Sequence, residues 1–342
     1  MLELINGKYK TISIVGMSKN SGKTVALNHL IGEAQEEGLP IGITSIGRDG
    51  ESLDIVTETE KPRIFLEEGA YIATATAMLP LGDASIEILK VTEYRTPLGE
   101  IIIGRVRDGG YVQIAGPQRL SEIKAVSDIM LSLGAKFVII DGALDRLSQA
   151  APTISEATIL STGAVLSRDK NKVIEETIHV VNTLGLPQVK DEEIRGMVRN
   201  LMEQNQIAII DDDKNIDKIP LKTALNAGHI IGDHLKENSR YLVIPGSLVK
   251  NTLEDLVRTT RKFKNIEIVI TDGTKVFIPP KEWLKFTRQG IKVTVLDKIN
   301  LIGITVNPYA PGGYYFEPIE FLSKMKSYIP HIPVMDLVLG GE

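Results

Sequence analysis

The chain has 342 residues, 43% of them hydrophobic and 24% charged, which is the composition of a folded globular protein. Its formal net charge of −5 argues against strong non-specific attraction to nucleic acid or to an anionic membrane. The chain contains no cysteine, which excludes disulfides, thiolate metal sites, iron–sulfur clusters and cysteine nucleophiles.

Membrane and export signals are also missing from the sequence. No apolar run reaches the length of about 20 residues that a membrane-spanning helix needs. The first residues, MLELINGKYKTISIVG, contain no long apolar stretch before a small-residue cleavage site. We therefore expect a soluble, cytoplasmic protein without nucleic-acid or membrane partners.

The first third of the chain has the pattern of an α/β protein, a mostly parallel sheet flanked by helices. A strand is predicted at Thr11–Val15, a helix from about Lys23 to Glu37, and a second strand at Ile41–Ile46. From about residue 60 to residue 117, alternating runs are separated by turn signals such as Pro-Leu-Gly-Asp. These runs predict a β-meander inserted into the α/β unit.

The same alternation resumes after the predicted insertion, with a helix at Ser121–Leu133 and a strand at Phe137–Asp141. Further strands are predicted at Thr158–Leu160, Ile207–Ile210, Tyr241–Ile244, Ile266–Ile270, Lys292–Leu296 and Leu301–Val306. Further helices are predicted near Lys170–Leu184, Asp191–Gln204, Leu221–Leu235, Thr252–Lys262 and Pro318–Tyr328. We expect one region at 1–150 and a second α/β region at 151–342, with the option that both share one sheet.

Residues Gly16 to Thr24 (GMSKNSGKT) lie between a predicted strand and a predicted helix, the context of a phosphate-binding P-loop. Glycines let backbone N–H groups curl around phosphate oxygens, and the helix N-terminus adds a partial positive charge. The pattern assigns Lys23 to the β- and γ-phosphates and the Thr24 hydroxyl to Mg²⁺. The predicted nucleotide-binding residues of this segment are Gly16, Ser18, Lys19, Asn20, Ser21, Gly22, Lys23, Thr24 and Val25.

The spacing of this loop departs from the usual pattern, which would place its first glycine at Met17. Gly16 is one residue further out, so the loop reads G-x5-GKT. This spacing resembles dethiobiotin synthetase and its relatives, within the SIMIBI class of P-loop proteins that includes nitrogenase iron protein and septum-site ATPases. Many members of that class carry a second lysine that activates a dimer. Here Ser18 has that position and Lys19 is offset by one. A homodimer is still one of the possibilities, but we do not expect Lys19 to activate it.

Two aspartates are candidates for the catalytic and metal-binding roles. Asp141 ends an apolar run in the Walker B pattern, where a carboxylate holds Mg²⁺; the alternative is a strand-to-helix turn residue. Asp49 has the place of a switch-I carboxylate that orients the attacking water or joins the metal shell; the alternative is a solvated turn. Arg48 beside it is a candidate phosphate contact. The catalytic candidates are thus Lys23, Asp49 and Asp141, and the metal candidates are Thr24, Asp49 and Asp141.

Base recognition has a weaker signal. The Asn/Thr-Lys-x-Asp motif that reads guanine is absent from the sequence, so we expect ATP as the nucleotide. Asn307 follows a predicted strand and resembles the strand-terminal asparagine that reads adenine in related ATPases. The alternative for Asn307 is a plain Asn-Pro turn.

Three other groups of residues have less specific interpretations. His229 and His234 are five residues apart, which does not place them on one helix face, so we interpret them as solvent-facing or core histidines. Asp211–Asp213 is interpreted as an acidic turn and not as a metal cluster. The aromatic and glycine-rich segment Tyr309–Phe316 is either a loop that contacts a ligand or partner, or a loop packed on the core.

Three segments, TISIVGMSKNSGKTVALN, SIGRDGE and FVIIDGA, resemble the smaller reactivase subunit encoded with lysine and ornithine aminomutases. These aminomutases use adenosylcobalamin and pyridoxal phosphate in amino-acid fermentation. The resemblance implies a slow ATPase that helps to exchange damaged cobalamin for fresh cofactor. It implies two partners, the aminomutase and a larger ATPase subunit that resembles mismatch-repair protein.

Two other functions remain open at this point. One is an ATP-dependent synthetase of the dethiobiotin synthetase type, which activates a carboxylate as an acyl phosphate; the G-x5-GKT spacing favours it. The other is a nucleotide-binding module that inserts a cofactor and has no substrate of its own.

Overall fold

The computed structural model describes residues 1–46, 64–142 and 154–338, and all structural statements refer to these residues. They form two compact units, one of residues Met1–Thr177 with Asn300–Glu342 and one of residues Ile178–Ile299. The division therefore does not fall near residue 150, where the sequence suggested it. The reason is that three described strands that follow residue 150 join the sheet of the first unit.

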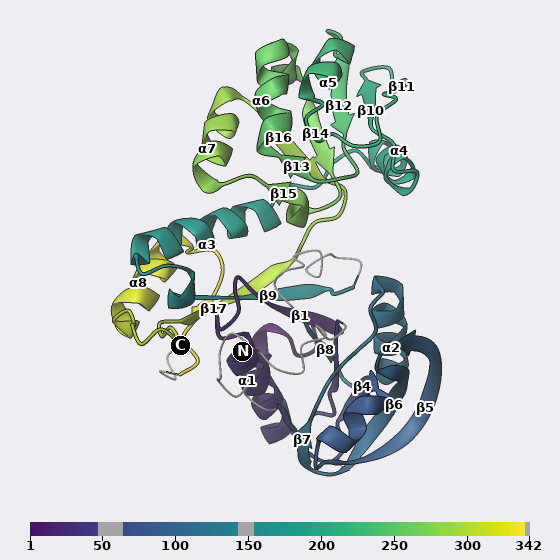
Figure 1. The fold of residues 1–342 in the computed structure, drawn as a ribbon, viewed down its shortest axis with the longest axis vertical. Coiled ribbons are helices and arrows are strands. Elements are labelled where there is room, and N and C mark those ends of the chain that lie inside the picture. Colours follow the sequence, from purple (N-terminus) through teal and green to yellow (C-terminus); the bar gives the residue numbers. More distant parts are fainter. Residues whose placement is uncertain (47–63, 143–153, 339–342) are drawn as a thin grey trace. The chain divides into compact units, whose positions relative to one another are not determined.

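The first unit contains a large, mostly parallel sheet whose nine described strands have the order β18-β17-β9-β1-β8-β2-β4-β6-β5 (Figure 1). Its strands are β1 (Thr11–Gly16), β2 (Gly42–Ser45), β4 (Tyr71–Ala75), β5 (Ser85–Thr96), β6 (Gly99–Asp108), β8 (Val138–Asp141), β9 (Ala157–Gly163), β17 (Leu301–Asn307) and β18 (Val334–Met335). All neighbours from β18 to β4 are parallel. The predicted α/β class is thus confirmed for this unit.

The predicted β-meander is wrong. Strand β4 pairs in parallel with β2, and its antiparallel neighbour is β6 and not the next strand β5. Two short strands, β3 (Ile64–Leu66) and β7 (Gly110–Val112), form a separate antiparallel pair. Every residue of β4 is buried, which suits the interior of a sheet covered on both faces. Turn signals locate strand ends but do not say which strands pair.

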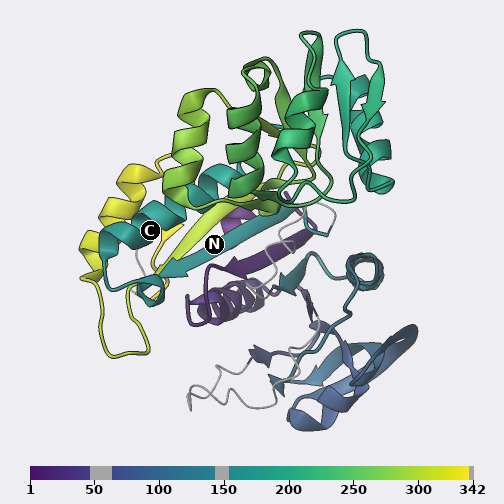
Figure 2. The same cartoon turned by 45° about the horizontal axis from the view of Figure 1, so that its top comes forward.

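Helices cover both faces of this sheet. On β8, Ile139 packs in the core that contains Leu27 and Leu30 of α1 (Lys23–Glu36). The neighbouring Ile140 packs instead with residues of α2 (Leu120–Ser132). Successive side chains of a strand point to opposite faces, so α1 and α2 lie on opposite sides of the sheet. Figure 2 shows α1, in purple, on one side of these strands.

The shorter helical elements of the first unit are η1 (Leu2–Leu4), η2 (Thr76–Leu81) and η4 (Ala164–Leu166), and its last helix is α8 (Pro318–Tyr328). Helix α3 (Lys170–Leu184) begins in the first unit and ends in the second. The predicted bounds of α3 and α8 agree with the structure.

The second unit has a mixed five-stranded sheet in the order β11-β10-β12-β14-β16. Its strands are β10 (Ala208–Asp211), β11 (Ile216–Lys218), β12 (Ser239–Val243), β14 (Glu267–Ile270) and β16 (Lys292–Val295), with a short parallel pair of β13 (Leu248–Val249) and β15 (Val276–Phe277). Strands β12, β14 and β16 are parallel, and β10 is antiparallel to both of its neighbours. The helical elements are α4 (Glu192–Glu203), α5 (Gly228–His234), α6 (Lys250–Thr259), η5 (Lys262–Asn265), η6 (Gly273–Lys275) and α7 (Pro280–Gln289).

Two helix predictions differ from the structure in this unit. A helix was predicted at Leu221–Leu235, but the structure has only the shorter α5 there. The residues before α5 form turns, and Asn226 has a left-handed φ of +53° that ends any helix. Helix α7 was not predicted, although Pro280 stands in its first turn, where the missing N–H of proline costs nothing.

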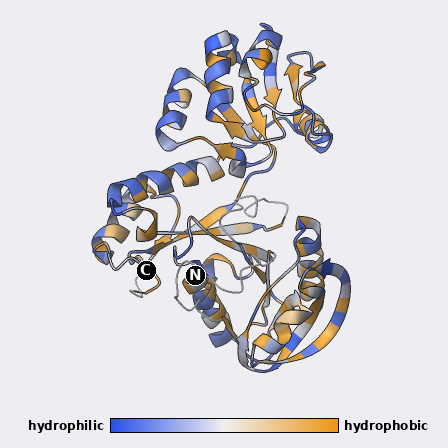
Figure 3. Cartoon of the chain, in the orientation of Figure 1, coloured by the Kyte–Doolittle hydropathy of each residue, from blue (hydrophilic) through white to orange (hydrophobic). Residues whose placement is uncertain are grey.

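Each unit has its own hydrophobic core on the two faces of its sheet. Figure 3 shows hydrophobic residues concentrated on the strands of both units, while the helices carry both kinds of residue. Among the helices of the described residues, none is long and apolar enough to cross a membrane.

Candidate functional site

The loop between β1 and α1 has an ordered backbone with two left-handed residues. Asn20 has a φ of +62° and Gly22, the N-cap of α1, has a φ of +94°. The start of the loop is held to the neighbouring strand, since Met17 N donates to Ser161 O at 2.8 Å. Within the loop, Ser21 N donates to Ser18 O at 3.2 Å. The chain therefore turns sharply and enters α1 with its first helical residue at Lys23.

A side chain at the first position of this loop would have to displace the Ser21 hydroxyl. A Cβ on Gly16 would lie 2.4 Å from the Ser21 hydroxyl oxygen, closer than non-bonded atoms can approach. The Ser21 hydroxyl is buried and has no hydrogen-bond partner among the described residues. Ser21 thus packs closely on Gly16 inside the loop.

The N-terminus of α1 carries the charge pattern of an anion site. The first N–H groups of a helix have no partner within the helix, and they confer a partial positive charge. Gly22 has no side chain that could cap them, and the first turn contains no acidic residue. These donors are therefore suited to a phosphate group.

Lys23 and Asp141 come together beside this helix end. Strands β1 and β8 are neighbours with Ile14 opposite Asp141, which places the Asp141 carboxylate next to the loop. Lys23 Nζ donates to Gly142 O at 2.6 Å and forms an ion pair with Asp141 Oδ1 at 2.7 Å. The ion pair lacks hydrogen-bond geometry, so buried Asp141 Oδ1 has no hydrogen-bond donor among the described residues. A metal-bound water is the kind of donor that would fit this oxygen.

The remaining residues of the loop differ in exposure. Thr24 is half-buried in the first turn of α1, and Ser18 is half-buried in the loop. Lys19, Asn20 and Val25 are exposed. The structure thus brings Lys23 and Asp141 together as predicted, with Thr24 next in the chain. Arg48 and Asp49 lie outside the described residues.

Asn307, predicted from its place after a strand, lies against the loop. It ends β17, opposite Gly163 of β9. Its side-chain Nδ2 donates to Asn20 O at 3.1 Å, and its Oδ1 accepts from Tyr309 N at 3.1 Å. The amide therefore connects the phosphate loop to the segment that follows β17, and it retains one N–H for another acceptor.

These residues share one edge of the sheet because the strands that carry them are parallel. Gly16, Asp141, Gly163 and Asn307 all stand at carboxyl ends of neighbouring strands. Ser161 also belongs to this edge; its hydroxyl accepts from Thr305 Oγ1 at 2.8 Å. Ser161-Thr162-Gly163 was not predicted as part of the site, although this polar and glycine-containing run follows apolar residues in the sequence.

The Tyr309–Phe316 segment is a small hairpin that is partly packed and partly exposed. Tyr309 and Tyr315 are bridged as antiparallel partners, and their rings lie 5.9 Å apart. Tyr314 donates its hydroxyl to Ala164 O at 2.8 Å, and Phe316 packs on Phe321. Tyr314 and Phe316 thus pack on the protein, as one of the two sequence interpretations proposed, while Tyr309 and Tyr315 are exposed. Contact of the exposed tyrosines with a ligand or partner stays a prediction.

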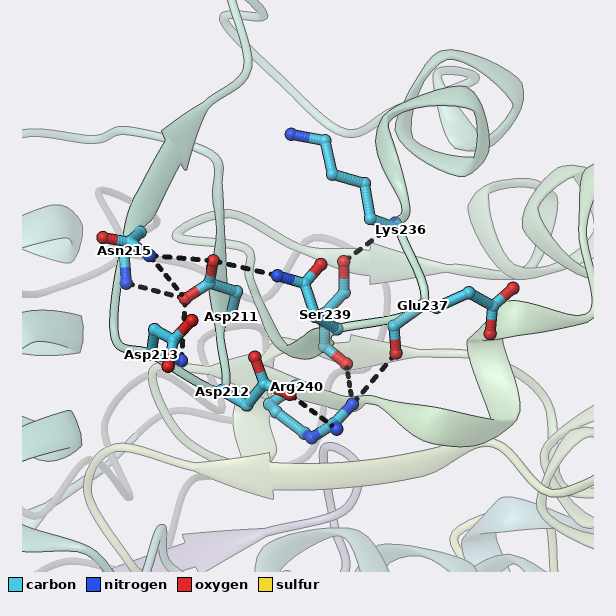
Figure 4. Close-up of polar contacts among 9 residues, drawn as sticks. Asp211, Asp212, Asp213, Asn215, Lys236, Glu237, Ser239 and Arg240 are labelled. Carbon is cyan, nitrogen blue, oxygen red and sulfur yellow. Dashed lines mark hydrogen bonds and ion pairs between the residues drawn. The ribbon is translucent and has the colours of Figure 1, made fainter.

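In the second unit, Asp211–Asp213 forms an acidic turn, as interpreted from the sequence (Figure 4). The Asp211 carboxylate accepts from the backbone N–H groups of Asp213 and Asn215 and from the side-chain amides of Asn215 and Asn238. These hydrogen bonds, above all that of the Asn215 side chain, lower the pKa of Asp211. Its oxygens are thus occupied by donors from the protein.

A cavity of about 260 Å³ lies beside this turn. Its charged groups are paired with one another, as in the 3.2 Å ion pair of Lys236 with Asp217. His234 lines the cavity, but the described residues contain no group of three His, Asp or Glu side chains arranged for a metal ion. The loop of residues 16–24 is therefore the stronger candidate site.

No protein-family model, curated protein or solved structure was found to match this chain.

Proposed function

We propose that this chain is a P-loop nucleotide-binding protein of the ATPase class, with ATP and Mg²⁺ as its ligands. One observation carries the proposal. A glycine-containing loop joins a buried strand to a helix, and the lysine at the helix start lies 2.7 Å from an aspartate at the end of the neighbouring strand. This arrangement suits triphosphate binding, since it combines backbone donors, an ammonium group and a carboxylate that could hold a metal ion.

Each residue of the site then has a defined task. The N–H groups at the start of α1 bind phosphate oxygens, and the Lys23 ammonium neutralises charge on the β- and γ-phosphates. Thr24 Oγ1 and Asp141 Oδ1 are the groups that would hold Mg²⁺, directly or through water, and the ion supplies charge stabilisation when bound. In hydrolysis, a water oxygen bonds to the γ-phosphorus while the bond between the γ-phosphorus and the β–γ bridging oxygen breaks. The products are ADP and phosphate, and the proton lost by the water passes to solvent. Asp49 is the proposed group that orients this water, and Asn307 is proposed to contact adenine.

Thermal unfolding with and without ATP and Mg²⁺ tests this step of the proposal. A ligand that binds only the folded chain stabilises it by about 2.7 kcal/mol at 100 times its Kd. Lys23→Ala should lose most of this stabilisation. The matched control is Lys10→Ala, which removes an exposed lysine at the opposite end of β1 and should keep the full shift. Equal shifts in Lys23→Ala and Lys10→Ala would reject the site.

Within this class, we propose that the chain acts as a reactivation factor for an adenosylcobalamin-dependent aminomutase. The support is the resemblance of residues 11–28, 45–51 and 137–143 to the smaller reactivase subunit. Such a factor uses ATP binding and hydrolysis to switch between two conformations, one of which opens the client enzyme. A nucleotide can shift this equilibrium only by its different affinities for the two conformations. The client should therefore bind the ATP and ADP forms unequally and should change nucleotide affinity in return.

A reconstitution experiment tests the reactivation proposal. A cobalamin-inactivated lysine or ornithine aminomutase is incubated with this chain, the larger ATPase subunit, ATP, Mg²⁺ and free adenosylcobalamin. Recovery of mutase activity that requires ATP, and that Lys23→Ala abolishes, supports the proposal. Failure with both mutases, together with ATP-dependent consumption of a small carboxylic acid, would instead favour a synthetase of the dethiobiotin synthetase type.

A further inference from the structure

Asn307, the last residue of β17, reaches the phosphate loop with a side-chain hydrogen bond to the backbone of Asn20. We infer that Asn307 is a positioning residue that holds this loop in its phosphate-binding shape, and that this task is separate from any contact with the base. The inference rests on the proposed nucleotide function. It assigns to Asn307 a role that acts through the loop backbone, 287 residues away in sequence.

The hydrogen bonds of Asn307 fix one peptide unit of the loop. The Asn20 carbonyl oxygen accepts from Asn307 Nδ2 at 3.1 Å. The N–H of the same peptide unit belongs to Ser21 and donates to Ser18 O at 3.2 Å. The unit is thus held at both its oxygen and its hydrogen. These two hydrogen bonds limit rotation of the peptide unit, and so they preserve the conformation of the loop backbone.

The same amide is anchored on its other side, which determines its orientation. Asn307 Oδ1 accepts from Tyr309 N at 3.1 Å, and a backbone N–H can only donate. The amide oxygen must therefore face Tyr309 and the amide nitrogen must face the Asn20 carbonyl. Only a side chain with both a donor and an acceptor can make these two bonds at once.

Two glycines permit Asn307 to come this close. A Cβ on Gly163, opposite Asn307 in β9, would lie 2.3 Å from Asn307 O. A Cβ on Gly22 would lie 3.1 Å from Asn307 Cβ, and Gly22 also has a left-handed φ. The side chain thus sits between the end of β9 and the start of α1. In this position it supports the strained turn that contains Asn20, at φ +62°.

The structure offers a matched control at the other end of the same strand. Asn300 precedes β17, and its side-chain Nδ2 donates to the backbone carbonyl of Glu156 at 3.1 Å. Asn300→Ala therefore removes the same type of hydrogen bond at the amino edge of the sheet. Asn307→Ala removes both bonds of the positioning amide without adding a charge near the phosphates.

Binding of two probes separates positioning from base recognition. Calorimetric Kd values are measured for Mg²⁺–ATP and for Mg²⁺–tripolyphosphate, which has phosphates but no base. For Asn307→Ala we expect about tenfold weaker binding of tripolyphosphate, the size of one lost hydrogen bond, and at least as large a loss for ATP. Binding of both probes should be unchanged in Asn300→Ala. A loss for ATP alone would overturn the inference in favour of base reading, and unchanged binding of both probes would also overturn it.

Amide hydrogen exchange without nucleotide tests the same inference independently of the proposed function. In Asn307→Ala, peptides that cover residues 17–24 should exchange faster than in the wild type, and in Asn300→Ala they should not. Unchanged exchange of these peptides would show that Asn307 does not hold the loop. If Asn307→Ala does not fold, Asn307→Leu replaces it in both experiments, because leucine is close to asparagine in shape and has neither a donor nor an acceptor. The two proposals can also fail separately. If the wild type binds neither probe, but Asn307→Ala still speeds exchange in residues 17–24, the nucleotide function is rejected and the positioning role of Asn307 is retained.

Discussion

The Lys23 ammonium lies 2.7 Å from Asp141 Oδ1, although 118 positions separate the two residues in the sequence. Each side chain is about a quarter exposed, at 23% and 24%, although the Asp141 Oδ1 atom itself is buried, so solvent partly screens the pair. The pair therefore contributes little to stability, and both side chains can turn toward other partners. The pair matters for function because of its position: Lys23 begins α1, and Asp141 ends β8, which is the neighbour of β1.

Replacing Asp141 should affect hydrolysis far more than folding. In Asp141→Asn we expect ATP hydrolysis to fall about 100-fold or more, because metal-ion charge stabilisation is worth several kcal/mol. The free energy of unfolding should change by less than about 1 kcal/mol, since the ion pair is partly exposed. Turnover and thermal unfolding are measured in parallel, with Asp128→Asn on the exposed side of α2 as control. If Asp141→Asn hydrolyses ATP near the wild-type rate, Asp141 does not act in hydrolysis and is only a residue of the turn after β8.

Thr24 is predicted to act through its hydroxyl group. Thr24→Ala should raise the Mg²⁺ concentration for half-maximal hydrolysis about tenfold, because it removes one metal ligand or water contact. Thr24→Ser keeps the hydroxyl and should behave like the wild type. A Mg²⁺ titration of hydrolysis distinguishes the two variants, and identical curves for both would remove Thr24 from the metal shell.

Asp49 is predicted from the sequence to orient the attacking water. Asp49→Ala should therefore lower kcat more than it weakens ATP binding. Single-turnover hydrolysis and calorimetric Kd values measure the two effects separately. A loss in binding without a loss in kcat would contradict this role.

Asp272 in the second unit should give this unit an unusual pH dependence. Burial raises the pKa of Asp272, and hydrogen bonds from Thr274 only partly oppose this. The folded state therefore binds its proton more tightly than the unfolded state, so stability is lost as pH rises from the ordinary pKa of 3.8 through the raised value.

Urea unfolding at several pH values checks this, with the fluorescence of Trp283, the single tryptophan of the chain and a buried residue of the second unit, as the signal. Asp272→Asn should lack this part of the pH dependence, whereas Asp233→Asn, which removes an exposed carboxylate, should retain it. Parallel pH curves for wild type and Asp272→Asn would contradict the assignment.

The local parts of the candidate site could be predicted from the sequence. The strand, the loop of residues 16–24 and the helix that follows are set by neighbouring residues, and all three occur as expected. Asp141 was identified as the end of an apolar run, and the parallel pairing of β8 with β1 brings it to Lys23.

Long-range contacts could not be predicted in the same way. The bond from Asn307 to Asn20 depends on the strand order β17-β9-β1, which periodicity does not reveal. For the same reason the antiparallel strands after β4 were assigned the wrong order. Gly163 illustrates the limit: its small size matters only because Asn307 lies against it in the folded chain.

The most direct test of the nucleotide-binding account is a crystal structure of the chain with Mg²⁺ and a non-hydrolysable ATP analogue. The account predicts the triphosphate within the loop of residues 16–24, with Lys23 Nζ on a phosphate oxygen and Asp141 facing the metal or its water. A nucleotide bound elsewhere would contradict it. So would crystals grown with a saturating concentration of the analogue in which the loop holds no nucleotide and Lys23 still pairs with Asp141.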